Sequence, residues 1–224
     1  PICKPKHPPN SPEVIFSLST SSAASTAHSL SLSYAHSKLR QRSNSSADSH
    51  DDHECLLWPH SLRRLHLYNN KLRTLPQSFE RNFQCLEGLS LCNNYLTEFP
   101  DVLYYHPHLK SLDLSKNRIT RLPHNIGEML PNTLESLHLG HNRLSELPAS
   151  LFVSNLHVLH AMGNRLHTLP TLSNQLQLDN VASSMERLNV GNNVLTWIPH
   201  EWFEFREHSN VASLFPKLRV FNVD

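Results

Sequence analysis

The sequence contains very few glycines and no long apolar run. These two features argue against a phosphate-binding loop and against a membrane-spanning helix. Only five glycines occur among 224 residues, so a glycine-rich loop that cradles phosphate is not expected. No run of about 18 apolar residues occurs, so no membrane-spanning helix is expected. The formal net charge is +1, which gives no support for binding nucleic acid or an anionic membrane.

Short motifs of several enzyme classes are also missing. The sequence holds no G-x-x-x-x-G-K-[ST], no G-x-S-x-G and no H-E-x-x-H, which are the signatures of nucleotide-binding loops, serine hydrolases and zinc proteases. Cys92 with His66 or His138 would supply a nucleophile and a base, but no base stands at the matching places of the adjacent expected strands. We therefore expect no enzymatic activity and no cofactor in this chain.

Cysteine is scarce and scattered. The four cysteines are Cys3, Cys55, Cys85 and Cys92, and they form no tight cluster of the kind that caps extracellular repeat arrays. We expect four free thiols in a reducing compartment, and hence a cytoplasmic protein. The alternative is that Cys55 is paired with a partner that the sequence does not reveal.

What the sequence does contain is an internal repeat, L-x-x-L-x-L-x-x-N-x-L-x-x-L-P, seen most completely in Leu109–Pro123. Six copies begin at Leu62, Leu86, Leu109, Leu134, Leu156 and Met185, and a seventh begins at Leu218 and stops at Asp224. The first four intervals between copies fall in the 20–29 residue class of leucine-rich repeats. Because the chain begins at Pro1 and the last copy is cut, we expect a fragment of a longer protein.

This pattern resembles the leucine-rich repeat family, of the intracellular type. The resemblance implies an α/β fold, a solenoid curved like a horseshoe, with a parallel β-sheet on the concave face and short helical turns or loops on the convex face. The repeat domain is expected to cover residues 55–224. Cys55–Pro59 supplies apolar residues that suit a cap over the first repeat.

The physical chemistry of the repeat agrees with this fold. In a short strand, both leucines of Leu-x-Leu point to one side and the residue between them to the other. One repeat cannot bury its leucines alone, so the repeats must stack into a common core. Large apolar residues three places after the repeat's proline are expected to close the core on the convex side; these are Phe79, Leu103, Ile126, Leu151 and Trp202. In the fifth repeat this place holds Ser173 and breaks the rule.

Residues 1–54 differ from the rest, because Ser, Thr, His and Pro dominate and apolar residues are sparse. Such a segment buries too little surface to offset the entropy lost on ordering, so we expect a disordered tail. Ser45 follows Arg40 and Arg42 in a sequence that resembles a site for a basophilic kinase, although an unmodified polar tail is the plainer reading. Two insertions, 171–184 and 199–217, lengthen the last repeats and have no assigned role.

One asparagine recurs at the same place in every full repeat. These residues are Asn70, Asn94, Asn117, Asn142, Asn164 and Asn193. A catalytic site does not need six copies, and the family resemblance implies a structural ladder in which each side chain hydrogen-bonds the backbone of neighbouring loops.

The candidate binding surface is the opposite side of the expected strands. Its members are Arg64, His66, Tyr68, Ser90, Cys92, Asp113, Ser115, His138, His160, Met162, Arg187 and Asn189. This mixture of charge, histidine, sulfur and small residues suits a protein-binding surface with a few anchors. Asp113, His138 and His160 have the residue types of a metal site, but an open sheet spreads its side chains, so we expect no metal there. A row of histidines could make binding depend on pH.

These observations predict a protein–protein interaction scaffold that binds a partner protein on the concave face, acts in intracellular signalling, and is a monomer without affinity for nucleic acid or membrane. The alternative is a targeting or regulatory segment of a larger enzyme, a protein phosphatase or kinase, whose catalytic domain lies outside this chain. A third reading is part of an extracellular receptor.

Overall fold

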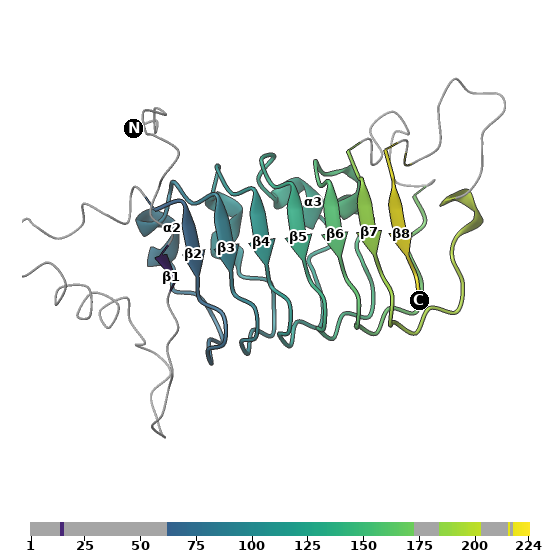
Figure 1. The fold of residues 1–224 in the computed structure, drawn as a ribbon, viewed down its shortest axis with the longest axis horizontal. Helices are drawn as coiled ribbons and strands as arrows, with labels where there is room; N and C mark the ends of the chain where they lie inside the picture. Colours follow the sequence, from purple (N-terminus) through teal and green to yellow (C-terminus); the bar gives the residue numbers. More distant parts are fainter. Residues whose placement is uncertain (1–13, 16–61, 173–183, 203–214, 216) are drawn as a thin grey trace, which may run out of the picture. The chain divides into compact units, whose positions relative to one another are not determined.

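The computed structural model describes residues 14–15, 62–172, 184–202, 215 and 217–224. Short parallel strands form one eight-stranded sheet in which the spatial order follows the chain order, from β1 to β8 (Figure 1). The strands are β1 (Val14–Ile15), β2 (Arg64–His66), β3 (Gly88–Ser90), β4 (Ser111–Asp113), β5 (Ser136–His138), β6 (Val158–His160), β7 (Arg187–Asn189) and β8 (Val220–Asn222). This arrangement is the solenoid that the repeat predicts.

The central residue of each strand lines the core. Leu65, Leu89, Leu112, Leu137, Leu159 and Leu188 are paired in register across β2 to β7, and none is more than 3% exposed. Each leucine therefore covers the leucine of the neighbouring repeat. Since burial of one such side chain is worth about 2 kcal/mol, the stacking of repeats is what stabilises each short strand.

Short helical turns lie behind the sheet and close the core from the convex side (Figure 1). They are α2 (Ser78–Asn82), η2 (Asp101–Tyr105), α3 (Ile126–Met129), η3 (Ala149–Val153) and η5 (His200–Trp202). The five residues expected to plug the core on this side are all buried, which confirms that prediction: Phe79, Leu103, Ile126, Leu151 and Trp202. In the fifth repeat Leu172 is fully buried, while Ser173 lies outside the described residues.

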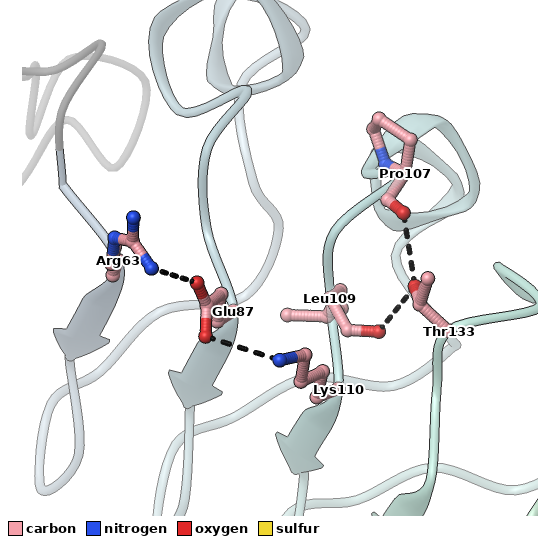
Figure 2. A network of polar contacts seen from close by, with 6 residues as sticks. All are labelled: Arg63, Glu87, Pro107, Leu109, Lys110 and Thr133. Atoms are coloured by element: carbon pink, nitrogen blue, oxygen red, sulfur yellow. Dashed lines mark hydrogen bonds and ion pairs between the residues drawn. The ribbon is translucent and has the colours of Figure 1, made fainter. Parts of the chain in front are cut away.

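Polar side chains link neighbouring repeats near the start of the strands. The carboxylate of Glu87 accepts a hydrogen bond from the Arg63 guanidinium at 2.6 Å and lies 3.5 Å from the Lys110 ammonium (Figure 2). One repeat further on, the Thr133 hydroxyl lies within hydrogen-bonding distance of two carbonyl oxygens, those of Pro107 and Leu109 (Figure 2). These contacts link four successive repeats near the residues at which the copies begin.

Two residues of the segment expected to be disordered, 1–54, lie in a strand of the sheet. Val14–Ile15 forms β1, which pairs in parallel with β2 through Val14 opposite Leu65 and Ile15 opposite His66. The N–H and C=O groups at the edge of β2 would otherwise lack hydrogen-bond partners in the sheet, and the short apolar run at Val14–Ile15 pairs with them. The remainder of this segment, with Ser45 and the expected cap at Cys55–Pro59, lies outside the described residues.

The prediction of four free thiols is wrong. Cys85, which precedes β3, is disulfide-bonded, and its partner lies outside the described residues. Cys92 is a free thiol. Disulfides persist in oxidising environments, so the thiols no longer support a reducing compartment. Within the described residues, no helix is both long enough and apolar enough to span a membrane.

Candidate functional site

The concave face, defined here as the face of the sheet opposite the helical turns, carries three rows of side chains. In the middle row, His66, Ser90, Asp113, His138, His160 and Asn189 are paired in register from β2 to β7. The row two places earlier contains Arg64 and Arg187, and the row two places later contains Tyr68, Cys92, Ser115 and Met162. The twelve predicted site residues therefore share one face of one sheet.

Asparagines at the ends of the strands hold these rows in place. The Asn117 side-chain nitrogen donates to the carbonyl oxygens of Leu91 and Leu114, both at 3.0 Å, and its oxygen accepts from the Leu96 N–H at 3.0 Å. Asn94, Asn142 and Asn164 repeat the same three bonds in their own repeats. The ladder satisfies backbone groups that the turn buries, so it makes the strand ends rigid.

A left-handed residue precedes each ladder asparagine and turns the chain off the sheet. These residues are Asn69, Asn93, Lys116, His141, Gly163 and Asn192, all with φ between 53° and 65°. Their N–H groups donate to the next repeat, as from Lys116 to the Gly140 carbonyl at 2.8 Å. The rows on the concave face therefore end at turns of uniform geometry, which gives the face a fixed spacing of about 4.8 Å between strands.

Two histidines of the middle row, on neighbouring strands, have their rings in contact. The ring centroids of His138 and His160 are 4.7 Å apart and the rings are nearly perpendicular, at 78°. The Ser136 hydroxyl lies 2.9 Å from His138 Nε2 and holds that ring in position. Burial lowers the pKa of His160, and the charges of His138 and Arg187 lower it further. These effects disfavour the charged form of the His160 imidazole.

Cys92 lies in the last row beside acidic and basic neighbours. Burial raises the pKa of its thiol, Asp113 raises it further, and Lys116 opposes them. A nucleophilic cysteine needs a lowered pKa, so the raised pKa of Cys92 does not favour an activated thiol. Asp113 itself accepts a hydrogen bond from the Ser115 N–H at 2.9 Å, which directs its carboxylate along the turn.

The structure does not bring Asp113, His138 and His160 together as metal ligands. Among the described residues, no group of three or more His, Cys, Asp or Glu side chains could hold a metal ion. His138 and His160 come together as a pair, but Asp113 does not join them. At the other end of the row, the rings of His66 and Tyr68 are 6.1 Å apart in an edge arrangement.

A second set of side chains lies outside the predicted site. Basic residues follow the ladder asparagines in most repeats and lie at the turns, not on the strands. The signal was present in the repeat pattern, at the place after each asparagine. Alternation along a strand predicts only which strand residues face away from the core. It therefore does not predict the basic residues at the turns.

Comparison with protein families locates the repeats in the first part of the described chain. A family model described as "Leucine rich repeat" matches residues 60–119, and one described as "Leucine Rich repeats (2 copies)" matches residues 107–151. The two matches cover the copies that begin at Leu62, Leu86, Leu109 and Leu134.

Similar proteins differ widely in length and name. The chain is 34% identical over 110 residues to a leucine-rich repeat serine/threonine-protein kinase 1 of Mus musculus, covering 49% of this chain but 5% of the kinase. It is 35% identical over 94 residues to fibromodulin of Oryctolagus cuniculus, covering 42% of this chain and 61% of that protein. A solved leucine-rich repeat protein of Leptospira interrogans has a TM-score of 0.56 and 31% identity, covering 72% of this chain and 37% of its own.

Proposed function

Because this chain is a leucine-rich repeat protein, we propose that it acts as a protein-interaction domain whose concave face holds a partner protein, in a signalling role. The observation that carries the proposal is the rigid row around His138 and His160. Their rings meet at 4.7 Å on neighbouring strands, and the ladder fixes the ends of those strands. A surface that is ordered before binding loses less entropy when a partner docks.

The composition of the face supports a protein partner. Imidazole rings, Tyr68 and Met162 offer amphipathic contact area, and Arg64 and Arg187 stand at opposite ends of the described repeats. Aromatic residues, methionine and arginine are enriched where binding energy concentrates in protein interfaces. In this proposal the chain contributes binding and not catalysis, and it acts as a monomer.

The matched variants for a test lie on opposite faces. The chain of residues 1–224 would be immobilised beside a concave variant, His138→Ala with His160→Ala, and a convex variant, His124→Ala with Glu128→Ala. All three would be exposed to the same lysate. Proteins retained by the parent and the convex variant, and at least tenfold depleted from the concave variant, would support the proposal. Equal retention by all three would refute it.

A second candidate is a targeting segment of a larger enzyme. It is favoured by the relative named as a serine/threonine-protein kinase, of which the matched part is only 5%. Sequencing the complete transcript tests it directly. A catalytic domain encoded in the same open reading frame would support this second candidate. An open reading frame that encodes only repeats would refute it.

A further inference from the structure

The residues that follow the ladder asparagines form a second row, at the turns beyond the carboxyl ends of the strands. Four of its six members are basic, an aromatic residue stands between the first two of these, and an aliphatic residue ends the row: Lys71, Tyr95, Arg118, Arg143, Arg165 and Val194. The turns lie along the lower edge of the sheet in Figure 1. This location separates the row from the concave face and from the helical turns.

Backbone hydrogen bonds place the row members beside one another. The N–H groups of Arg118, Arg143 and Arg165 each donate at 2.8 Å to the preceding repeat, at the residue next to that repeat's row member. Tyr95 and Val194 make the equivalent bonds at 2.8 and 3.1 Å. The spacing between neighbours is that of parallel strands, about 4.8 Å. From Lys71 to Arg165 the row is therefore about 19 Å long.

These charges are exposed and uncompensated. Lys71, Arg118, Arg143 and Arg165 are exposed, and within the part of the chain that the structure describes they form no ion pair. The same turns carry three more cations, Arg73, Lys116 and Arg121, and two carboxylates, Glu98 and Glu146. Evenly spaced cations in excess of neighbouring acids create a positive potential that attracts anionic groups.

One end of the row is apolar. Val194 is 51% exposed and Trp197, in the same turn, is 52% exposed. Trp197 is fixed by a parallel bridge to Thr168 in the preceding repeat. A large exposed tryptophan held on a rigid backbone is well suited to anchor an apolar side chain, since tryptophan and arginine dominate binding energy at protein interfaces.

We propose that this basic edge, the turns carrying Lys71, Arg118, Arg143, Arg165 and Trp197, binds an extended acidic segment of a partner protein whose apolar end docks on Trp197. An extended chain rises about 3.3 Å per residue, so six residues span the row. The planar guanidinium groups present paired donors that match carboxylates.

Features of the row argue against other polyanions. Single-stranded nucleic acid is bound by aromatic faces on which bases stack. The Tyr95 ring is covered instead by the Arg118 guanidinium, 4.2 Å from the ring centroid. Glu98 and Glu146 lie among the cations and would repel a uniformly charged duplex or membrane. An acidic peptide can place its carboxylates at the arginines and avoid the two glutamates.

The test uses the full chain and a fluorescent peptide of six glutamates followed by phenylalanine, with a peptide of six glutamines followed by phenylalanine as its control. The edge variant is Arg118→Glu, Arg143→Glu and Arg165→Glu. The matched control is Arg81→Glu, Lys217→Glu and Arg219→Glu, which changes the net charge equally at exposed residues away from the edge. Circular dichroism checks that each variant is folded.

Three lost ion pairs should weaken binding of the acidic peptide about tenfold or more in the edge variant, and no more than about twofold in the charge-matched control. Trp197→Ala should weaken binding of this peptide, but not of six glutamates that end in glutamine. His138→Ala with His160→Ala should leave it unchanged. For the parent alone, raising NaCl from 0.05 to 0.5 M should weaken binding at least tenfold, which tests the proposal even if the edge variant fails to fold.

Equal loss in the edge variant and its charge-matched control would overturn the proposal, because binding would then follow net charge alone. It would also be overturned if the acidic peptide binds no better than the glutamine peptide. Edge-dependent binding of oligo(dT) or of phosphatidylserine vesicles, without binding of the acidic peptide, would assign the edge to another class of polyanion.

Discussion

The imidazole rings of His138 and His160 meet edge to face, 4.7 Å apart, on neighbouring strands of the concave face. The sequence separates these residues by one repeat, and only the in-register pairing of β5 and β6 brings them together. The contact is one of the causes that lower the pKa of His160, after burial.

The first prediction concerns pH and folding stability. Burial is the main cause of the lowered pKa of His160, so the folded chain takes up this proton at lower pH than the unfolded chain. Stability linked to His160 is therefore complete above about pH 6.5 and is lost as pH falls through the lowered folded pKa. His160→Gln should reduce the drop in urea midpoint between pH 7.5 and 5.0.

The control for this prediction is His124→Gln, since His124 is exposed on the convex side. In the His124→Gln variant, the urea midpoint should fall between pH 7.5 and 5.0 by as much as it does in the parent. If His160→Gln and His124→Gln show the same drop as the parent, His160 contributes nothing to acid sensitivity.

The second prediction concerns the asparagine ladder. Asn117→Ala removes three hydrogen bonds donated to backbone carbonyls and one accepted from a backbone N–H, and the residue is 7% exposed. Leaving these groups unpaired should lower the free energy of unfolding by about 2–4 kcal/mol. Asn132→Ala, at an exposed position, should change it by less than about 0.5 kcal/mol. Urea denaturation followed by circular dichroism measures both, and similar values would contradict the ladder's role.

The third prediction concerns the packing of α3 against η3. A Cβ atom at Gly127 would lie 1.8 Å from the Ser150 carbonyl oxygen, and that backbone cannot move aside as a flexible side chain would. Gly127→Ala should therefore destabilise the fold by about 1–3 kcal/mol. At Gly88 the nearest atom to a new Cβ is a side-chain carbon of Arg64, at 3.5 Å. Gly88→Ala should be tolerated, and an equal loss at both sites would show that packing at Gly127 is not the cause.

The fourth prediction concerns the thiols. Because Cys85 is disulfide-bonded, Cys85→Ser releases its partner, so the number of thiols titrated in denaturant without reductant should rise by one. A fall by one would show that Cys85 is free. Opening the bond should cost about 2–4 kcal/mol of stability. Native Cys92 should react slowly with thiol reagents, because burial raises the pKa of its thiol.

Much of the fold was predictable because every repeat has the same leucine pattern and buries its leucines against the neighbouring repeat. Alternation around Leu112 and Leu137 predicts strands whose leucines share one face, and both residues are fully buried in paired strands. The buried positions of Phe79 and Trp202 followed from their distance to the repeat's proline. The predicted rows on the concave face also followed from this register.

Other features depend on contacts between segments that no local pattern encodes. Pairing of Val14–Ile15 with β2 was missed because an edge strand is selected by the open edge and not by its own composition. The disulfide at Cys85 was missed because scattered cysteines reveal no pairing. The basic edge was missed because its residues belong to turns.

The sequence by itself determined the solenoid, because a leucine pattern that repeats in every copy can be buried only by stacking the copies in order. It also determined which residues face the core and which face outward. Tertiary structure alone decided which outward side chains touch. Neighbours across parallel strands, such as His138 with His160 and Tyr95 with Arg118, are set by the register and by side-chain rotamers, and these depend on packing between repeats and not on adjacency along the chain.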